Sequence, residues 1–529
     1  MTSPLRRIGS GVSNWLRAER PDRAVLALAI LAALGAAVVC APNGYEHSGI
    51  GVPPEAAWGV FALGIATAAL AALRPWHGLL AWIVIMPLFT AARIGIEVGW
   101  VQITPSTILL GTLLIAVLLG FRGARPALPT APLVLAGTLA LLAALAAAFS
   151  ADQMTGVSIT LHGLIEPIGL GVLIILMRPG LRRLMAVAVA MTLSVTMAGI
   201  INTGRVLLIV HSASDFQSLR GELGRITYFN VGLYGGILVT VLPLMAMLIA
   251  RPALLADGLE RATVAASAAV GRTTTAWRPE TVRRAATWLR VAGWAGLAFA
   301  LLIVDFTFSK SAWIASLVLG IALAVLMPRT WRLRAVGLGV VVVFVGLFLA
   351  TDVVTNAPTS DRAASWDPNS TEGDVSVTGR FLATEAAMYM TIDHPLLGVG
   401  PGLFGVEYGG PYYNPEAHAV LQSAHDLIAN VAAEYGLPVA VVLAFLILTS
   451  LWVAWRLWRS GAGLAKLLAL GYGLSLAGFM IVATLFGSDL YRDYRFMNTD
   501  VLYAGLVMGA IAVLAELAKA PPGESALDE

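Results

Sequence analysis

The chain has 529 residues, of which 58% are hydrophobic and only 12% charged. Soluble globular proteins carry about 25% charged residues, so this composition excludes an ordinary soluble enzyme and predicts a membrane protein. The formal net charge of +3 identifies no partner, because in membrane proteins the distribution of Lys and Arg carries the information.

Apolar runs of about 17–22 residues recur along the chain, each long enough to cross a hydrocarbon core about 30 Å thick as a helix. The runs are continuous and do not alternate, which excludes a transmembrane β-barrel. We predict an all-α polytopic membrane protein with about fourteen transmembrane helices. The predicted spans cover about 25–42, 56–73, 77–94, 105–121, 130–149, 160–177, 184–202, 229–250, 291–308, 311–327, 335–351, 428–455, 466–487 and 501–518.

Basic residues are distributed unevenly between the two sides of the predicted membrane. With a cytoplasmic N-terminus, about 25 of the 34 Lys and Arg residues lie inside, a strong positive-inside bias. We therefore expect both termini in the cytoplasm. A basic, Ala-rich loop over about 251–290 is also inside, where it forms a surface helix on the anionic leaflet or a regulatory docking segment.

Two long outside loops, about 203–228 and 352–427, hold nearly all the extracytoplasmic polar residues. We divide the chain into a scaffold of residues 1–351, a catalytic loop of 352–427 with short helices, and C-terminal spans within 428–529, all in one integrated membrane domain. Because the positive-inside rule disfavours outside arginines, those found there are the better candidates for function. The outside basic residues include Arg205, Arg220, Arg225, Arg362, Arg380, Arg492, Arg495 and Lys310, the last in a tight hairpin.

Motifs of common soluble enzymes are missing from the sequence. There is no P-loop and no HExxH zinc motif, and GVGPG at 398–402 lacks the Lys-Ser/Thr of a phosphate loop. Cys40 is the only cysteine, which excludes an intrachain disulfide and a thiolate metal cluster. We expect no metal, no cofactor and no nucleic-acid partner.

The stretch 393–438 combines a glycine-rich turn, a histidine and the start of an apolar helix. Gly398, Gly400 and Gly402, with neighbouring prolines, cannot form a helix and can adopt positive φ, which suits a tight turn at the membrane surface. The alternative is a simple loop without a function of its own.

His425 opens the helix that leads into the predicted span 428–455, and either Ser423 or Asp426 is placed to cap that helix. Histidine is the side chain best suited to take a proton near neutral pH, so His425 is the candidate base. The alternative is an amphipathic residue at the membrane interface. Glu434 lies nine residues further along, near the opposite side of the helix, so direct pairing with His425 is not expected.

Three outside arginines are candidates for binding an anion. Arg380 begins an amphipathic helix over about 380–392, and Arg220 and Arg225 precede the span that begins near residue 229. Contact with lipid headgroups is the alternative for each of them. Guanidinium groups bind phosphate oxygens bidentately, so these arginines and one histidine indicate a diphosphate-bearing lipid as substrate.

Glu166 is the main acid well within a predicted span, and Pro167 follows it. An ionisable residue inside the membrane is a functional candidate by default. A buried acid that is hydrogen-bonded beside the proline break is an equally good interpretation.

Several of these motifs resemble the O-antigen ligase and polymerase family of bacterial membrane proteins. HPLLGVGPGLF at 394–404 is similar to the HPxxGxGxGxF turn of that family. SAHD at 423–426 and EYGLP at 434–438 resemble its alanine-histidine-asparagine element and its E-Y-G start of a span. FSKSAW at 308–313 and TGR at 378–380 are supporting matches.

The resemblance implies a metal-independent glycosyltransferase on the outer face of the bacterial cytoplasmic membrane. It would move a glycan from an undecaprenyl-diphosphate donor to a hydroxyl of a glycan, lipid or protein acceptor. By resemblance, His425 activates that hydroxyl, Arg220 and Arg380 hold the diphosphate, and the turn from Gly398 to Gly402 shapes the loop over the site. The further candidates are Arg225 and Lys310 for the donor and Asp426, Glu434 and Glu166 as supporting acids.

Three positions depart from the family pattern. Asp426 replaces the usual asparagine, and Lys310 replaces an arginine, which weakens a bidentate contact. The spacing from Arg220 to Asn230 is about one residue longer than the pattern, so either Arg220 or Arg225 is the counterpart.

Two alternatives to a ligase or polymerase are open. A polysaccharide transporter or flippase predicts ionisable residues inside the spans, and only Glu166 fits that expectation. A protein O-oligosaccharyltransferase shares the same motifs, so the sequence leaves the acceptor undetermined.

Overall fold

The computed structural model describes residues 54–92, 96–98, 101–120, 130–209, 231–250, 279–306, 310–326, 337–342, 345, 375–415, 420–485 and 499–519. Arg220, Arg225, the predicted span 25–42 and most of the basic loop 251–290 lie outside these residues.

The first described helices are α3 (Pro54–Leu73), α4 (Pro75–Ala92) and α5 (Pro105–Gly120). Each begins at a proline, which is tolerated there because the first turn of a helix does not use its own N–H groups. Between α4 and α5, a short antiparallel hairpin pairs β1 (Ile96–Val98) with β2 (Val101–Ile103). The other described elements of secondary structure are helices, so this hairpin is an addition to the predicted all-α fold.

A long helical segment follows α6 (Thr130–Ala148). It consists of α7 (Gln153–Thr160), a π-helical turn η1 (Leu161–Ile165) and α8 (Glu166–Met177). Asp152 caps α7, where its carboxylate accepts from the backbone N–H of Thr155 at 3.1 Å. The other described helices are α9 (Leu181–Ile209), α12 (Val231–Ala250), α14 (Pro279–Phe306), α15 (Lys310–Leu326), α18 (Val375–Asp393), α19 (Phe404–Tyr408), α20 (Leu427–Tyr435), α21 (Leu437–Ser460), α22 (Gly463–Leu485) and α23 (Thr499–Leu517).

Within the described residues, 4 helical segments are long and apolar enough to cross a membrane: Thr130–Ala148, Gln153–Met177, Leu437–Ser460 and Gly463–Thr484. Six shorter apolar helices accompany them. The described part of the chain is therefore a bundle of apolar helices, as the composition predicts for a membrane protein.

The predicted single span over 428–455 is wrong at its beginning. The helix that follows His425 is α20, which ends at Tyr435, and the long apolar helix α21 starts afresh at Leu437. Gly436 separates the two with φ 86° and ψ 166°, values outside the helical region. The backbone N–H of Leu437 donates to the carbonyl of Pro395 at 2.9 Å, so a contact with the glycine-rich turn replaces a helical hydrogen bond.

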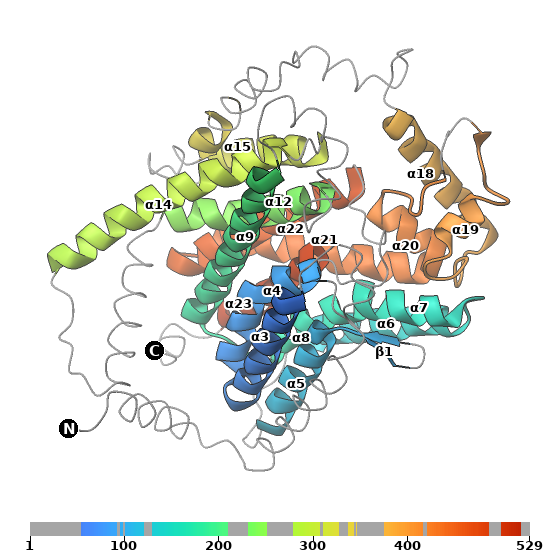
Figure 1. The fold of residues 1–529 in the computed structure, drawn as a ribbon, viewed down its shortest axis with the longest axis horizontal. Helices are drawn as coiled ribbons and strands as arrows, with labels where there is room; N and C mark the ends of the chain where they lie inside the picture. The colour runs from blue at the N-terminus through green and yellow to red at the C-terminus, as the bar shows by residue number, and fades with distance from the viewer. Residues whose placement is uncertain are drawn as a thin grey trace.

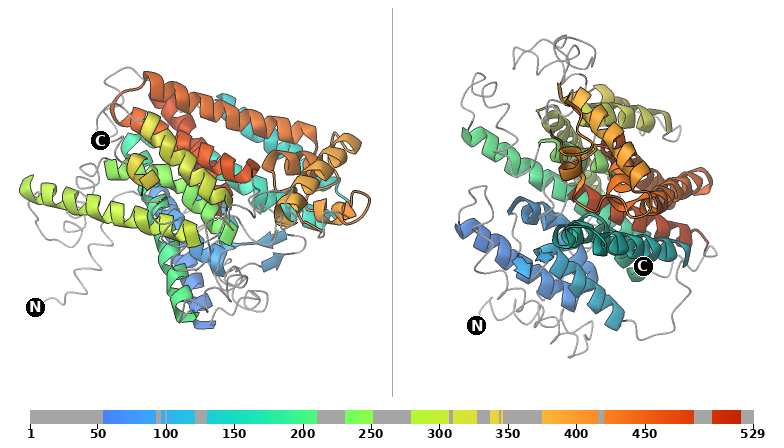
Figure 2. Two further views of the ribbon diagram at one scale, coloured as in Figure 1. Left: turned by 90° about the horizontal axis from the view of Figure 1, so that it is seen from above. Right: turned by 90° about the vertical axis from the view of Figure 1, so that its right-hand side faces the viewer.

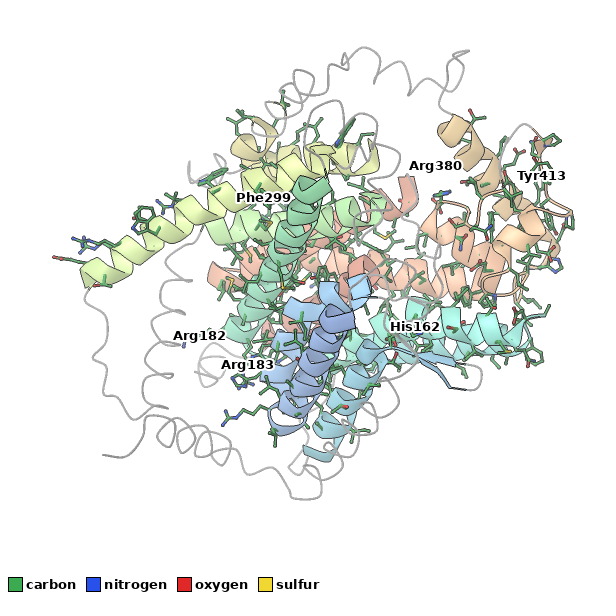
Figure 3. The ribbon with its side chains drawn as sticks, in the orientation of Figure 1. His162, Arg182, Arg183, Phe299, Arg380 and Tyr413 are labelled. Atoms are coloured by element: carbon green, nitrogen blue, oxygen red, sulfur yellow. The ribbon has the colours of Figure 1, made fainter. Side chains whose placement is uncertain are left out.

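Most helices share one large hydrophobic core. Figure 1 shows α18 and α19 at one end of this body, beside α20 and α7, and Figure 2 shows the same grouping from two other directions. Arg182 and Arg183, at the start of α9, lie at the opposite end of the molecule from Arg380 (Figure 3). The fold thus separates the α18–α20 region from a basic end.

Candidate functional site

Residues 375–415 and 420–436 form a small unit with a core of its own, which we call the α18–α20 unit. Buried side chains from α18, α19 and α20 meet in this core, which is distinct from the main one. The core residues are Ala383, Ala386, Ala387, Met390, Phe404, Tyr408, Ala424 and Ala433. Because small alanines line α18, that helix lies close to its neighbours.

The glycine-rich turn is hydrogen-bonded to the C-terminal end of α20. The N–H of Val399 donates to the carbonyl of Ala433 at 2.8 Å, and the N–H of Gly400 donates to the carbonyl of Glu434 at 3.1 Å. Carbonyls at a helix C-terminus have no partner within the helix, so the turn satisfies groups that would otherwise be exposed or unpaired. The turn motif and the E-Y-G motif are therefore one structural element.

Positive φ angles in the turn confirm the prediction for its glycines. Gly398, Gly400 and Gly402 have φ of 69°, 114° and 80°. A Cβ on Gly398 would also collide with the backbone carbonyl of Glu434 and approach the carbonyl oxygen of Ala433 to 2.6 Å. Glycine is required there by both conformation and space.

The turn also rests on the corner between α6 and α7. A Cβ on Gly400 would lie 2.6 Å from the hydroxyl of Ser150, and one on Gly402 would collide with Ile159. The hydroxyl of Thr160 donates to that of Tyr435 at 3.3 Å, so the last residue of α20 is joined to the end of α7. These contacts connect the α18–α20 unit to the membrane helices.

His425 is one of two described residues other than glycine with positive φ, at 55°. Such a conformation costs about 1–3 kcal/mol, and residues held in it cluster at functional sites. Hydrogen bonds hold both of its neighbours: the N–H of Ala424 donates to Oδ1 of Asn430 at 2.9 Å, and Oδ1 of Asp426 accepts from the N–H of Ala429 at 2.7 Å. The backbone around this half-buried histidine is thus fixed from both sides.

Asp426, one of the two predicted candidates, is the N-cap of α20. Its side chain is half-buried, and this burial raises the pKa of its carboxyl group above the ordinary value of 3.8, although the backbone N–H groups of Ala429 and Ile428 oppose the change. Ser423 is buried and is not the cap. The acid that follows His425 therefore has a structural role at the start of the helix.

Arg380 lies in the second turn of α18, which begins five residues earlier than predicted, at Val375. One turn further on, the hydroxyl of Thr384 lies 3.0 Å from the carbonyl of Arg380 and 2.9 Å from the carbonyl of Ala424. The helix that carries Arg380 is therefore bonded to the residue that precedes His425. Figure 3 shows Arg380 on α18, well apart from Tyr413 at the outer edge of the unit.

Glu434 is fully buried beneath the glycine-rich turn. Its Oε1 accepts from the backbone N–H of Phe404 at 3.4 Å. Burial raises the pKa of Glu434 to about 8, while the backbone amides of Gly402 and Phe404 and the side chain of Asn430 act in the opposite direction. Glu434 thus supports the turn and is neutral at physiological pH for most of the time.

The remaining predicted residues lie elsewhere or outside the described chain. Lys310 is the first residue of α15. Glu166 lies in the helical body, where its Oε1 accepts from the hydroxyl of Thr107 at 2.5 Å and its Oε2 lies 3.2 Å from Nδ1 of His162. Of the two interpretations of Glu166, this environment fits the buried, hydrogen-bonded acid. Arg220 and Arg225 belong to the part of the chain that is not described.

Sequence reasoning missed Thr384, Asn430 and Ser150. Asn430 interrupts the apolar run LIANVAA, and Thr384 follows Arg380 at the spacing of one helical turn, so both carried a weak signal. No sequence signal indicated Ser150, because its contact with Gly400 joins residues that are far apart in the chain. In the described residues, no group of three His, Cys, Asp or Glu side chains is placed to hold a metal ion.

Comparison with known proteins gives one family. The model of the O-antigen ligase family matches residues 295–444, which include Lys310, Arg380, the glycine-rich turn, His425 and Glu434. No curated protein matches the chain. The matched segment thus contains the whole α18–α20 unit together with α15, and excludes the corner at Ser150 on which the turn rests.

Proposed function

Because residues 295–444 of this membrane protein carry the O-antigen ligase domain, we propose that it is a transferase for lipid-linked glycans. In this proposal it moves a glycan from an undecaprenyl-diphosphate donor to an acceptor hydroxyl on the outer face of the bacterial cytoplasmic membrane. Surface polysaccharide is the product, through ligation or polymerisation. Transfer to a protein hydroxyl is the variant within the same class.

One observation carries the proposal: the half-buried His425 is held at positive φ between two fixed neighbours, on a unit whose helix α18 carries Arg380. Catalytic groups need a fixed geometry, and strained residues persist only when their surroundings maintain them. That support comes from the hydroxyl of Thr384, which donates a hydrogen bond, and from the side-chain oxygens of Asn430 and Asp426, which accept hydrogen bonds.

The reaction assigns each candidate residue a step. His425 takes the proton of the acceptor hydroxyl, whose oxygen then attacks the anomeric carbon of the donor sugar. The bond from that carbon to the diphosphate oxygen breaks, and undecaprenyl diphosphate leaves with the electron pair. Arg380, with Lys310 and either Arg220 or Arg225, stabilises the charge of the leaving group. The mechanism needs no metal ion.

Apolar side chains on the surface of the unit support a location at the membrane. Leu437, Val441 and Phe445 form an exposed stripe on α21, at the spacing of a lipid-facing helix surface. Leu396 is 72% exposed in the adjoining turn and Ile392 is 71% exposed at the end of α18. Because Leu437 is bonded to Pro395, the lipid-facing stripe continues into the unit, where a lipid-linked donor would arrive.

The topology that goes with this proposal has about fourteen spans, both termini in the cytoplasm and the α18–α20 unit outside. Residues 352–427 form the catalytic loop between the scaffold of 1–351 and the last spans within 428–529. The α6–α7 corner at Ser150, which touches Gly400, then lies on the same outer side.

Transport of a lipid-linked glycan is the second candidate. The observation in its favour is the buried pair of His162 and Glu166 within the helical body, since ionisable residues at membrane depth often line transport pathways. A transferase forms a covalent product in detergent. A transporter does not, and in detergent there are no two compartments between which it could move its substrate.

The test uses the purified full-length protein in detergent with an undecaprenyl-diphosphate oligosaccharide. Longer lipid-linked glycans would show a polymerase, whereas glycan on an added lipid-anchored or protein acceptor would show a ligase or a protein transferase. Arg380→Lys, which keeps the charge and loses the bidentate fork, is expected to lower kcat/KM for the donor by about tenfold or more. Wild-type protein that forms no covalent product with any acceptor class would leave transport as the better proposal.

A further inference from the structure

A cavity lies in the helical body, apart from the residues of the α18–α20 unit. Its volume is about 830 Å³, within the range of about 300–1,000 Å³ that is usual for ligand sites. Four helices line it: the first turns of α6, one face of α8 from Pro167 to Ile175, α21 from Phe445 to Ser460, and α23 from Gly505 onward. Its walls are mainly apolar, with Leu135, Ile175, Phe445 and Met508 among the lining residues.

Polar groups gather at one end of this groove. Thr130 is the first residue of α6, Ser460 is the last of α21, and Glu516 and Lys519 lie at the end of α23. Arg456 lines the groove one turn before Ser460. Because all these positions are helix ends on the same side, the groove has a long apolar part and a short charged mouth.

Aromatic residues indicate that the mouth lies at the level of the lipid headgroups. The last three turns of α21 carry Trp452, Trp455 and Trp458, a pattern typical of a membrane interface. The guanidinium of Arg456 lies 4.7 Å from the ring centre of Trp452, a cation–π contact that holds it at this level.

Among the described residues that line the mouth, the charges sum to one positive. Nζ of Lys519 lies 2.7 Å from Oε1 of Glu516, and this pair is neutral as a whole. Arg456 adds one positive charge beside it. A single phosphate diester carries one negative charge, so the mouth and such a headgroup are complementary.

We propose that this groove binds an anionic glycerophospholipid of the membrane leaflet opposite the α18–α20 unit. Its acyl chain fills the apolar part between α6, α8, α21 and α23, and its phosphate is held by Arg456 with Lys519. Basic pockets between transmembrane helices are known to select anionic lipid headgroups in this way. The site is separate from the proposed transfer chemistry and does not depend on it.

Native mass spectrometry of the delipidated full-length protein tests the proposal. The protein is titrated with palmitoyl-oleoyl phosphatidylglycerol and, separately, with palmitoyl-oleoyl phosphatidylcholine, which has the same chains and no net charge. We expect the anionic lipid to bind at least about tenfold more tightly, since charge-assisted hydrogen bonds are the strong ones. Arg456→Ala combined with Lys519→Ala should reduce that preference to near unity.

Arg459→Ala is the matched control, because Arg459 lies one turn further along α21, over Trp455 at 5.7 Å, and does not line the groove. Arg459→Ala should keep the preference for the anionic lipid. Ala512→Phe places a ring in the apolar part and should weaken both lipids. The proposal would be overturned by equal affinity for the two lipids or by an unchanged preference in the double variant. It would also be overturned if glycerol 3-phosphate alone displaced the lipid, or if a second copy of the chain occupied the groove.

Discussion

The hydroxyl of Thr384 lies 2.9 Å from the carbonyl oxygen of Ala424, and this hydrogen bond joins α18 to the backbone immediately before His425. The same hydroxyl lies 3.0 Å from the carbonyl of Arg380. One side chain therefore links the helix that carries the candidate phosphate-binding arginine to the segment that carries the candidate base. This contact therefore holds the backbone of α18 near Arg380 against the backbone that leads to His425.

Thr384→Val removes that link while it preserves the shape of the side chain. The carbonyl of Ala424 loses a donor, which costs about 1–3 kcal/mol for a buried group. We expect transfer activity to fall by about tenfold or more, with the loss in kcat, because misplacement of a base slows the chemical step. Initial rates with a lipid-linked oligosaccharide measure this. Thr391→Val is the control, since the Thr391 hydroxyl donates only to Ala387 in its own helix, and an equal loss there would contradict the assigned role.

Substitutions of His425 can separate the role of the imidazole in catalysis from the strain of the backbone. This is possible because glycine adopts the φ of 55° found at this position without strain. His425→Gly should leave the thermal midpoint of unfolding unchanged or raise it, whereas His425→Ala retains the backbone strain. Both variants should lose about 10²–10⁴-fold in transfer rate if His425 is the base. A glycine variant that is both stable and active would show that the imidazole has no part in catalysis.

Gly398→Ala is expected to disrupt the turn. The new Cβ would collide with the carbonyl group of Glu434 at a φ of 69°, so the variant should lose more than about 1 kcal/mol of stability. Thermal unfolding in detergent measures the loss. Gly410→Ala is the matched control in the same unit, because its Cβ would meet only the carbonyl oxygens of Val406 at 3.5 Å and Glu407 at 3.7 Å, which are ordinary contacts. Equal midpoints for the two variants would be inconsistent with this packing.

The raised pKa of Glu434 predicts that the free energy of unfolding decreases as the pH rises. Its pKa is about 8 in the folded protein against an ordinary value of 4.5, so between these values the folded state holds a proton that the unfolded state has released. Stability should therefore fall as the pH rises through this window, by up to about 1.4 kcal/mol per pH unit from this group. The raised pKa of Asp426 adds a contribution of the same sign at the lower end.

Glu434→Gln isolates the contribution of Glu434, because the amide has the shape of the carboxyl group and does not titrate. The unfolding midpoint of this variant should depend less on pH than that of the wild type across the same window. Parallel midpoint curves for the two proteins would mean that Glu434 is charged in the folded state or that its surroundings are open to water.

The sequence by itself determined the class of protein and the main local features. Continuous apolar runs require helices in a membrane, because only a helix satisfies its own backbone hydrogen bonds there. Gly398, Gly400 and Gly402 predicted a non-helical turn that can adopt positive φ, and Asp426 was one of two candidate caps, beside Ser423. These features depend on residues that are close together in the chain.

Only the tertiary structure decided how these pieces fit together. It placed the glycine-rich turn on the end of α20, broke the predicted span at Gly436, and joined Thr384 to Ala424 and Ser150 to Gly400. Each of these contacts depends on which backbone groups remain unpaired after the helices form, and on the side chains that fold back to satisfy or cover them. No local pattern records that outcome, because the partners lie tens or hundreds of residues apart.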